Sequence, residues 1–219
     1  CKKYVVCDKA EGEIVTQALS LGDFNGIDMC IAGRVNLSYG TEPSVSVSAQ
    51  QNVIDALSNK IEGGIWKINF DECMKRYELT IDITLPELTR VDVSGSGDIY
   101  GENQFPDLDQ LELKISGSGS IELDAVAEVV DSRISGSGDI TLIGEVGRLA
   151  HRTSGSGSFY AYNCAIERAE IRISGSGKAR LNVTQSLDVR ISGSGDVYYR
   201  GNPTGDSQIT GSGKVINDN

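Results

Sequence analysis

Hydrophobic and polar residues alternate with period two on both sides of a tetrapeptide that recurs through the second half of the chain. The residue before each tetrapeptide is β-branched and nearly always apolar, and the one before that is polar. After the tetrapeptide a polar residue precedes an apolar one. This alternation predicts a short strand on each side of a sharp corner. The two inward columns are Val93, Ile115, Ile134, Thr153, Ile173, Ile191 and Ile209, and Ile99, Ile121, Ile140, Phe159, Ala179, Val197 and Val215.

The corner itself reads Ser-Gly-Ser-Gly in six copies, and Thr replaces the first Ser in a seventh. The copies start 22, 19, 19, 20, 18 and 18 residues apart, which indicates a structural repeat and not a flexible linker. Glycine can adopt positive φ, and serine can hydrogen-bond nearby backbone, so both residues suit a tight corner. The corners begin at Ser94, Ser116, Ser135, Ser154, Ser174, Ser192 and Thr210.

A period near 19 residues is about one coil of a three-sided solenoid. Each unit would return to its start through a further stretch of roughly eight to ten residues, and successive coils would stack at the strand spacing of roughly 4.8 Å. One unit alone cannot bury its apolar side. Stacking places like positions above one another, so the β-branched columns are predicted to form a continuous core.

The region from residue 21 to residue 90 lacks the repeat but also reads as β-rich. A short helix is predicted over Gln51–Asn59, and Pro86 ends the last strand before the first corner. We therefore expect an extended segment over residues 1–20, a β-rich part over 21–90 and the β-helix over 91–219, with the last two continuous. The strands expected in the middle part are Ile27–Ile31, Arg34–Ser38, Ser44–Ser48, Ile65–Phe70 and Glu78–Leu85.

Composition agrees with an ordered body and limits the partners. The 219 residues are 39% hydrophobic and 23% charged, enough for a sizeable core. The formal charge of −11 argues against a nucleic-acid partner, because phosphate binding needs a basic surface. No run of about 18 apolar residues is present, so no membrane-spanning segment is expected.

The chain starts with Cys1, which is followed by Lys2 and Lys3. A mature bacterial lipoprotein begins with an acylated cysteine, so Cys1 is a candidate lipid anchor and the lipid would be the only contact with a membrane. The alternative is that the sequence begins at a cysteine by chance.

Four further cysteines allow three disulfide pairings, between which the sequence does not choose. Cys30 and Cys164 lie in apolar or mixed strand contexts, and we expect them to be buried thiols. Cys7 and Cys73 are the favoured pair if a disulfide forms. No two cysteines have the close C-x-x-C spacing of a zinc or redox site.

Several motifs together resemble one known family. They are LGDFNGIDM, GRVNLSYG, SVSVSAQQNVIDAL, GGIWKINF and LTIDITLPELTRVDVSGSGDIYG, followed by repeated ISGSGDI. From about residue 21 to the end, the chain resembles the auto-transporter adhesins of the head GIN domain family, which is common in Bacteroidetes. The resemblance implies a right-handed parallel β-helix of pectin-lyase-like shape, export to the cell envelope or outer membrane, and a role in adhesion without known catalytic residues.

An enzymatic function is an alternative, because some carbohydrate-active enzymes are also β-helices. The candidate acids are Asp98, Asp139 and Asp196, which follow three of the corners. Asp139 and Asp196 would lie roughly 14 Å apart at the strand spacing, too far for a carboxylate dyad. We expect these aspartates to accept backbone N–H bonds at the corners. No catalytic, cofactor-binding or metal-binding residue is predicted.

Arginine occupies the polar position two residues before four successive corners, at Arg133, Arg152, Arg172 and Arg190. Four like charges stacked about 4.8 Å apart repel one another unless they are partnered. One interpretation is a salt-bridge ladder with acids of a neighbouring column. The other is a strip that binds anions or acidic glycans, for which guanidinium groups are suited. The acids available are Glu112, Asp131, Glu170 and Asp188.

Tyr100, Tyr160 and Tyr198 share a polar-side column after the corner, with Tyr162 and Tyr199 close by. Exposed aromatic rings can stack on sugars, so these residues are a second candidate binding surface. The alternative is that tyrosine is simply a favourable strand residue on a half-exposed face.

His151 is the only histidine and occupies an otherwise apolar column with Val91, Leu113, Ile171 and Val189. It is predicted to point inward with a hydrogen-bond partner, which leaves no credible Ser-His-Asp arrangement.

The sequence thus favours a non-enzymatic cell-envelope adhesin or binding protein. Its partner would be a glycan or a surface protein, met through exposed Tyr and Arg columns. A carbohydrate-active enzyme on a β-helix is the first alternative. The second is a structural assembly module, including a homo-oligomer, whose exposed end strands pair with another chain.

Overall fold

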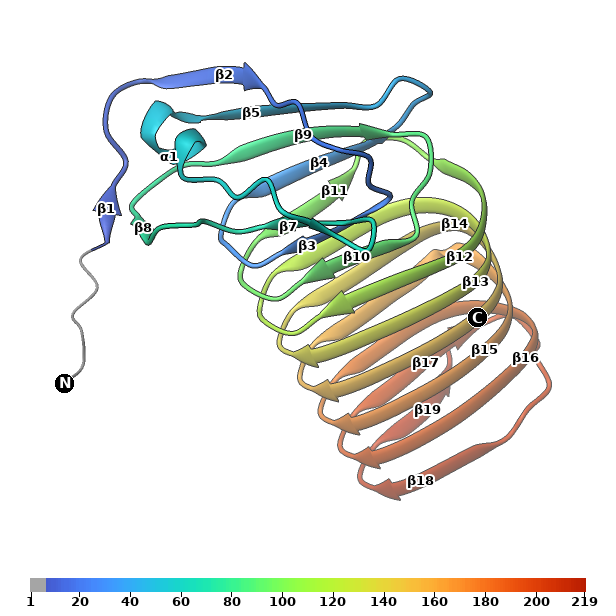
Figure 1. Ribbon diagram of the computed structural model, residues 1–219. Coiled ribbons are helices and arrows are strands. Elements are labelled where there is room, and N and C mark those ends of the chain that lie inside the picture. The colour runs from blue at the N-terminus through green and yellow to red at the C-terminus, as the bar shows by residue number, and fades with distance from the viewer. Residues whose placement is uncertain (1–6) are drawn as a thin grey trace.

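The body of the molecule is a parallel β-helix, as the repeat predicted (Figure 1). The computed structural model describes residues 7–219. Long strands follow the coils from corner to corner, and each pairs in parallel with the equivalent strand of the next coil. The strands of this part are β10 (Arg90–Val93), β11 (Asp98–Gly101), β12 (Phe105–Ile115), β13 (Ser120–Gly136), β14 (Asp139–Gly155), β15 (Ser158–Gly175), β16 (Lys178–Gly193), β17 (Asp196–Arg200), β18 (Ser207–Gly211) and β19 (Lys214–Asn217).

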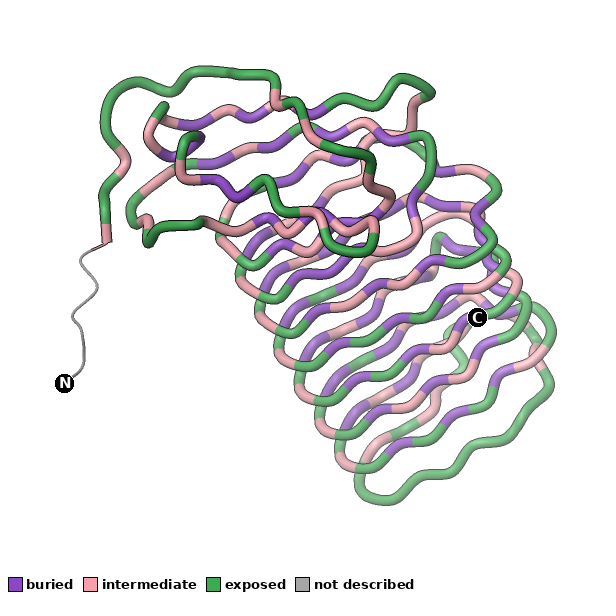
Figure 2. Tube along the Cα trace, viewed as in Figure 1, coloured by how far each residue is buried: buried purple, intermediate pink, exposed green. Residues whose placement is uncertain are grey.

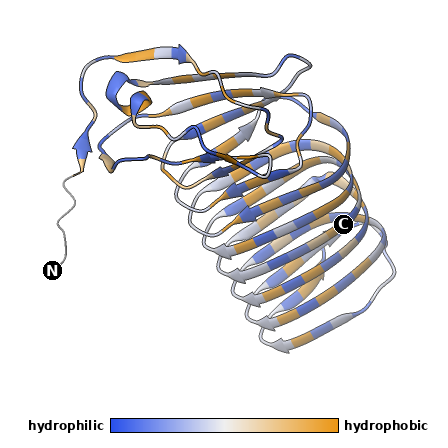
Figure 3. Cartoon of the chain, viewed as in Figure 1, coloured by the Kyte–Doolittle hydropathy of each residue, from blue (hydrophilic) through white to orange (hydrophobic). Residues whose placement is uncertain are grey.

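The register between coils places like residues on like residues. Ile134 is paired with Thr153, which is paired with Ile173, and the column continues through Ile191 to Ile209. All members of this column except Ile209 are buried. Purple buried positions alternate with exposed ones along the coils in Figure 2, and orange apolar positions alternate with blue ones in Figure 3. The period-two pattern therefore corresponds to the inner and outer faces of the solenoid.

Both glycines of a corner approach the backbone of the preceding coil closely, and the first one also adopts an unusual φ in most corners. The first glycine takes positive φ from the third corner onward, as at Gly155 with φ of +138°. A Cβ at Gly155 would lie 2.3 Å from the carbonyl oxygen of Gly136 in the preceding coil, and a Cβ at Gly157 would lie 2.1 Å from that of Gly138. Only glycine fits these positions without a steric clash.

The N-terminal part extends the solenoid and covers one end of it. Strand β3 pairs with β10, and β4 pairs with β11, so the sheet continues without a break. Antiparallel strands β5 and β2 then add to the sheet beyond β9. The bounds are β1 (Asp8–Lys9), β2 (Ile14–Ala18), β3 (Gly26–Met29), β4 (Arg34–Tyr39), β5 (Ser44–Gln50), α1 (Gln51–Asp55), β6 (Ile61–Glu62), β7 (Ile65–Ile68), β8 (Met74–Lys75) and β9 (Thr80–Leu85).

All five strands expected in this part are present, and the helix is confirmed but shorter than predicted. Helix α1 ends at Asp55, where the sequence suggested Asn59. Val53, Ile54 and Leu57 are buried, as their spacing indicated. Within the described residues no helix is long and apolar enough to cross a membrane.

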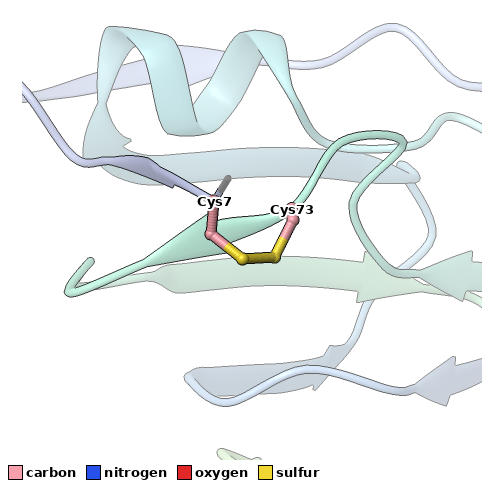
Figure 4. The surroundings of a disulfide bond; sticks show 2 residues. All are labelled: Cys7 and Cys73. Carbon is pink, nitrogen blue, oxygen red and sulfur yellow. A yellow bond between two sulfur atoms is a disulfide. The ribbon is translucent and has the colours of Figure 1, made fainter. Parts of the chain in front are cut away.

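The favoured disulfide is present between Cys7 and Cys73 (Figure 4). It joins the start of the described chain to β8, where β1 pairs in parallel with β8. Cys164 is buried as predicted, and burial raises the pKa of its thiol to about 12. The prediction for Cys30 was wrong: it is exposed, because it follows the inward-facing Met29 and alternation turns it outward. Cys1 lies outside the described residues.

Candidate functional site

The four candidate arginines form one outward-facing column on strands β13 to β16. Arg133, Arg152, Arg172 and Arg190 are consecutive register partners, and Gln208 of β18 follows them. They face outward because the next residue in each strand points into the core. The sequence therefore placed this column correctly.

A groove of about 620 Å³ runs along this column across five coils. The arginines form one wall and the first hydroxyl residue of each corner forms the other, since both have the same parity in the strand. The intervening backbone forms the floor. The sequence interpretation missed the hydroxyl wall, although its constant spacing of two residues from each arginine was a usable signal. The wall consists of Ser135, Ser154, Ser174, Ser192 and Thr210.

The predicted salt-bridge ladder is present only at Arg172, which pairs with Glu170. Among residues 7–219, no carboxylate lies within ion-pair distance of Arg133, Arg152 or Arg190. The ladder interpretation is therefore wrong for three of the four arginines.

The other expected acids have different partners. Glu112 pairs with Arg90 at 3.1 Å. Asp131 accepts a hydrogen bond from Gln110 at 3.2 Å, and Asp188 accepts the backbone N–H of Asp206 at 3.3 Å. None of these contacts involves an arginine of the column.

Arg152 is the central and least compensated member of the column. The residue two positions before it, where Arg172 has Glu170, is Ala150. Its register neighbours are Arg133 and Arg172, which at the strand spacing lie about 4.8 Å away along the sheet. A guanidinium with two cationic neighbours and alanine in place of the acid two positions before it gains from any anion that enters the groove.

The basic column has defined ends. On the side of the N-terminal part, Lys114 precedes Arg133 and Asp92 precedes Lys114. Burial raises the pKa of Asp92, and the Arg90 guanidinium, 2.6 Å from its Oδ2, opposes that rise. At the other end the uncharged Gln208 replaces arginine. Five consecutive cations from Lys114 to Arg190 thus lie between a partly buried ion pair and a neutral end.

The tyrosine column has a different arrangement from the one expected. Tyr160 and Tyr198 are separated by Arg180, whose guanidinium carbon lies 5.4 Å and 5.6 Å from the two ring centroids. Tyr100 is further away in the same column and contacts the Arg34 guanidinium at 4.6 Å. Cation–π contacts of this kind occupy a ring face that a sugar would need. None of these three tyrosines lines the arginine groove.

Arg180 was missed in the sequence, although counting from the corner places it two residues after Lys178, in the column of Tyr160 and Tyr198. The neighbouring Tyr162 also has partners. Its hydroxyl donates to Asp218 at 2.7 Å, and the Arg200 guanidinium lies 4.2 Å from its ring centroid. The tyrosines are thus held by the protein itself.

The corner aspartates accept backbone hydrogen bonds, as predicted. Asp139 accepts the N–H of Ser158 at 2.8 Å, and Asp196 accepts that of Lys214 at 3.0 Å. Asp98 accepts both the N–H and the hydroxyl of Ser120. Each aspartate therefore joins its own coil to the next.

His151 is fully buried, as its column indicated. Its Nδ1 lies 3.0 Å from the Ser132 hydroxyl and its Nε2 lies 2.7 Å from the Thr153 hydroxyl. The ring stacks on Phe159 with centroids 4.3 Å apart. Burial lowers the pKa of His151 to about 3, which keeps the imidazole neutral in the core.

A second depression, of about 560 Å³, lies on a different side of the solenoid and is acidic. Among the described residues, no group of three His, Cys, Asp or Glu side chains is arranged to hold a metal ion. The sequence interpretation did not single out this face, because its acids are not at constant distances from the corner. Its carboxylates are Asp107, Asp109, Glu128, Glu145 and Glu167.

Comparison with known proteins gives one family and several similar structures. The family model described as "Putative auto-transporter adhesin, head GIN domain" matches residues 23–203. No curated protein matches the chain.

The solved structures are similar over nearly their whole length. A putative adhesin from Bacteroides fragilis is 22% identical, with a TM-score of 0.90 and coverage of 96% of this chain and 99% of the other. A putative lipid binding protein from Parabacteroides distasonis is 24% identical, with a TM-score of 0.79 and the same coverage. A putative adhesin from Parabacteroides merdae is 18% identical, with a TM-score of 0.76 and coverage of 95% and 98%. At these identities the likeness establishes a shared fold.

Proposed function

The chain belongs to the auto-transporter adhesin family of the head GIN domain, and from this premise we propose that it is a non-enzymatic surface-binding protein whose ligand lies in the arginine groove. The family supports an exported envelope or surface protein of adhesin type. Beyond what the family supports, we propose a class of ligand and the residues that bind it.

The observation that carries the proposal is the lack of ion-pair partners for Arg133, Arg152 and Arg190 within the described residues. Stacked cations cost free energy unless a counter-charge is present. The protein has enough acids to neutralise them, yet Glu112, Asp131 and Asp188 bind elsewhere. A column in which three of the four arginines lack a carboxylate partner, beside a wall of hydroxyl groups, suits an anionic ligand. Guanidinium and hydroxyl donors both bind carboxylate, sulfate or phosphate oxygens.

The shape of the groove favours a linear ligand over a single small anion. The column from Arg133 to Gln208 spans four coil steps, or about 19 Å at the strand spacing. One cation per coil matches a polymer that presents an anionic group about every 5 Å, or about every 10 Å if alternate coils are used. We propose an acidic polysaccharide lying parallel to the solenoid axis.

The envelope location fits two features of the N-terminal part. The Cys7–Cys73 disulfide is expected in an oxidising compartment, because cytosolic proteins rarely keep one. We propose that Cys1 carries a lipid, which would tether the body through the short segment before Cys7. Mass spectrometry of the protein extracted from membranes tests the anchor by the mass added at Cys1.

The binding test compares two arginines of the same strand. Arg152→Ala removes the central cation of the groove, and Arg148→Ala removes an exposed arginine of β14 that does not line it. With polygalacturonate or dextran sulfate as the probe, Arg152→Ala should weaken binding about 10-fold to 100-fold, since a charge-assisted hydrogen bond contributes about 1.5 to 3 kcal/mol. Arg148→Ala should bind like the unmodified protein.

Two further measurements separate specific binding in the groove from general charge attraction. Neutral dextran should not bind, and added salt should weaken binding of the anionic polymers, because exposed charges are screened. Equal losses in Arg152→Ala and Arg148→Ala would reduce the effect to general charge attraction and contradict the groove. Binding to anionic lipid vesicles but to neither polymer would contradict the polysaccharide assignment.

We propose separately that the tyrosine column binds neutral sugars. Its rings already contact Arg180 and Arg34, so we expect a weaker contribution than from the arginines. A glycan array with Tyr160→Ala/Tyr198→Ala tests it, and unchanged binding to every neutral glycan would exclude the column. We propose no catalysis, since the corner aspartates are engaged with backbone N–H groups.

A further inference from the structure

The last coil of the solenoid is an open edge. Strand β18 pairs with β16, and β19 pairs with β17, and within the described residues neither has a partner on its other side. All five residues of β18 are exposed, and Ile209, which continues a buried core column, is 43% exposed. Figure 2 shows β18 in the green of exposed residues at the end opposite to the N-terminal part.

This edge lacks the features that protect a strand edge in water. Free edges usually carry charges, proline or bulges that prevent pairing with another chain. Residues 207–217 contain one charged side chain, Lys214, and no proline. The preceding coil places Arg190 and Tyr198 in the columns where the last coil has Gln208 and Ile216. The loss of charge and gain of apolar surface are typical of an edge that becomes covered.

Charge is distributed unevenly along the solenoid axis. Residues 170–219 carry six basic and five acidic side chains, whereas residues 1–169 carry 14 basic and 26 acidic ones. Two copies that approach through their last coils keep the strongly acidic parts furthest apart. An approach through the N-terminal parts would bring like charges together.

We propose that the covering partner is a second copy of this chain, joined through the last coil in a two-fold, tail-to-tail dimer. Strand β18 would pair antiparallel with β18 of the second copy. The register centred on Ile209 places it opposite Ile209 of the second copy and places Gln208 opposite Thr210 of the second copy. This pairing is self-complementary: no like charges face each other across it, and the exposed core residue is covered.

The dimer extends the surface that carries the groove. A two-fold axis perpendicular to the sheet keeps the outer face of β18 outward in both copies. The arginine column of one copy then continues into the hydroxyl column of the other, so the two grooves form one longer channel. The proposal does not depend on what the groove binds.

The other exposed apolar edge provides the matched control. Strand β2 exposes Ile14 at 49% and Val15 at 40% and lies at the acidic end of the molecule. Glu11 and Glu13 precede it directly. These charges protect the β2 edge from pairing with another chain, and β18 has no such charges.

The oligomeric state of the full chain tests the proposal. Analytical ultracentrifugation should show a concentration-dependent dimer for the unmodified protein. Ile209→Lys should convert it to a monomer, because two lysines would face each other, whereas Ile14→Lys should leave the dimer unchanged. A protein that stays monomeric up to its solubility limit, or a dimer that survives Ile209→Lys, overturns the proposal.

A rescue separates a broken interface from a damaged fold. Ile209→Lys and Ile209→Glu should each be monomeric, and an equimolar mixture should restore the dimer as a mixed pair, because opposite charges then meet at the two-fold axis. If both variants are folded by circular dichroism and the mixture stays monomeric, the register centred on Ile209 is wrong. Polyanion binding is also measured on the Ile209→Lys monomer. A monomer that still binds polyanions shows that the groove binds its ligand independently of the dimer, so the two proposals can fail separately.

Discussion

At the scale of single residues, His151 shows how a polar side chain is accommodated in an apolar column. Both ring nitrogens meet a hydroxyl, from Ser132 and Thr153, and the ring stacks on Phe159. The neutral imidazole is therefore satisfied, while its protonated form would be a buried cation without a carboxylate partner. Burial therefore disfavours the protonated form and lowers the pKa of His151 to about 3.

The lowered pKa predicts a specific pH dependence of stability. Because the folded state resists protonation that the unfolded state accepts, the free energy of unfolding should be highest above pH 6.5 and should fall as the pH drops toward 3. His151→Val removes this contribution and leaves the carboxylates in place. The difference in stability between the two proteins should shift by about 2 kcal/mol between about pH 7 and about pH 5.

Urea unfolding of both proteins at the two pH values measures that shift. The unpaired hydroxyls of Ser132 and Thr153 in the variant change its stability at every pH but leave its slope with pH unaffected. Parallel pH profiles for the two proteins would contradict the lowered pKa, because they would mean that the imidazole takes up a proton as readily in the folded state as in the unfolded state.

At the scale of elements, the corner and the strand before it are fitted to each other between coils. A Cβ on Gly157 would meet the carbonyl oxygen of Gly138 at 2.1 Å and Cγ2 of Ile134 at 2.6 Å. The same contact with a Cγ2 atom recurs at Gly138, Gly177, Gly195 and Gly213. The β-branched residue before one corner thus occupies the space that the second glycine of the next corner leaves, which explains why the two positions repeat together.

This fit predicts that Gly157→Ala is strongly destabilising. The nearest blocking atom is a backbone oxygen, which cannot move without displacing the stacked coils, so we expect a loss of about 3 kcal/mol in the free energy of unfolding. Gly22→Ala is the matched control, since its Cβ would meet only the Ile61 side chain at 3.6 Å. Urea denaturation compares them, and equal effects of the two substitutions would refute the close-approach role of the corner glycine.

The same geometry explains what the sequence could and could not predict. Because every column is counted from a fixed corner, the core, the Arg152 column and the inward position of His151 followed from residue numbers alone. Parity along β3 would also have placed Cys30 outside, but its apolar neighbours suggested burial.

Which acid pairs with which arginine depends on side-chain geometry, and the spacing of residues along the sequence does not determine it. Spacing gave Glu112 as a possible partner of the column, and it pairs with Arg90 in the adjacent coil instead. The antiparallel pairing of β2 with β5 was likewise beyond the sequence, because residues 14–18 alternate too weakly to fix a face.

At the scale of the whole molecule, each coil contacts only its two neighbours, so stability depends on position along the axis. The N-terminal part is joined to the coils through β3–β10 and β4–β11 pairing. We propose on this basis that residues 21–90 and 91–219 unfold as one unit. The last coil has a neighbour on one side only.

This position dependence predicts a gradient of local opening. Amide hydrogen exchange should be slowest in β13 to β15, which have full-length strands on both sides, and fastest in β18 and β19. Raising the protein concentration should slow exchange in β18 selectively if the last coil is covered by a second copy, because the dimer buries its free edge. The Ile209→Lys monomer should keep the gradient and lose the concentration dependence. Uniform protection from β13 to β19 at low concentration would contradict the one-sided support of the last coil.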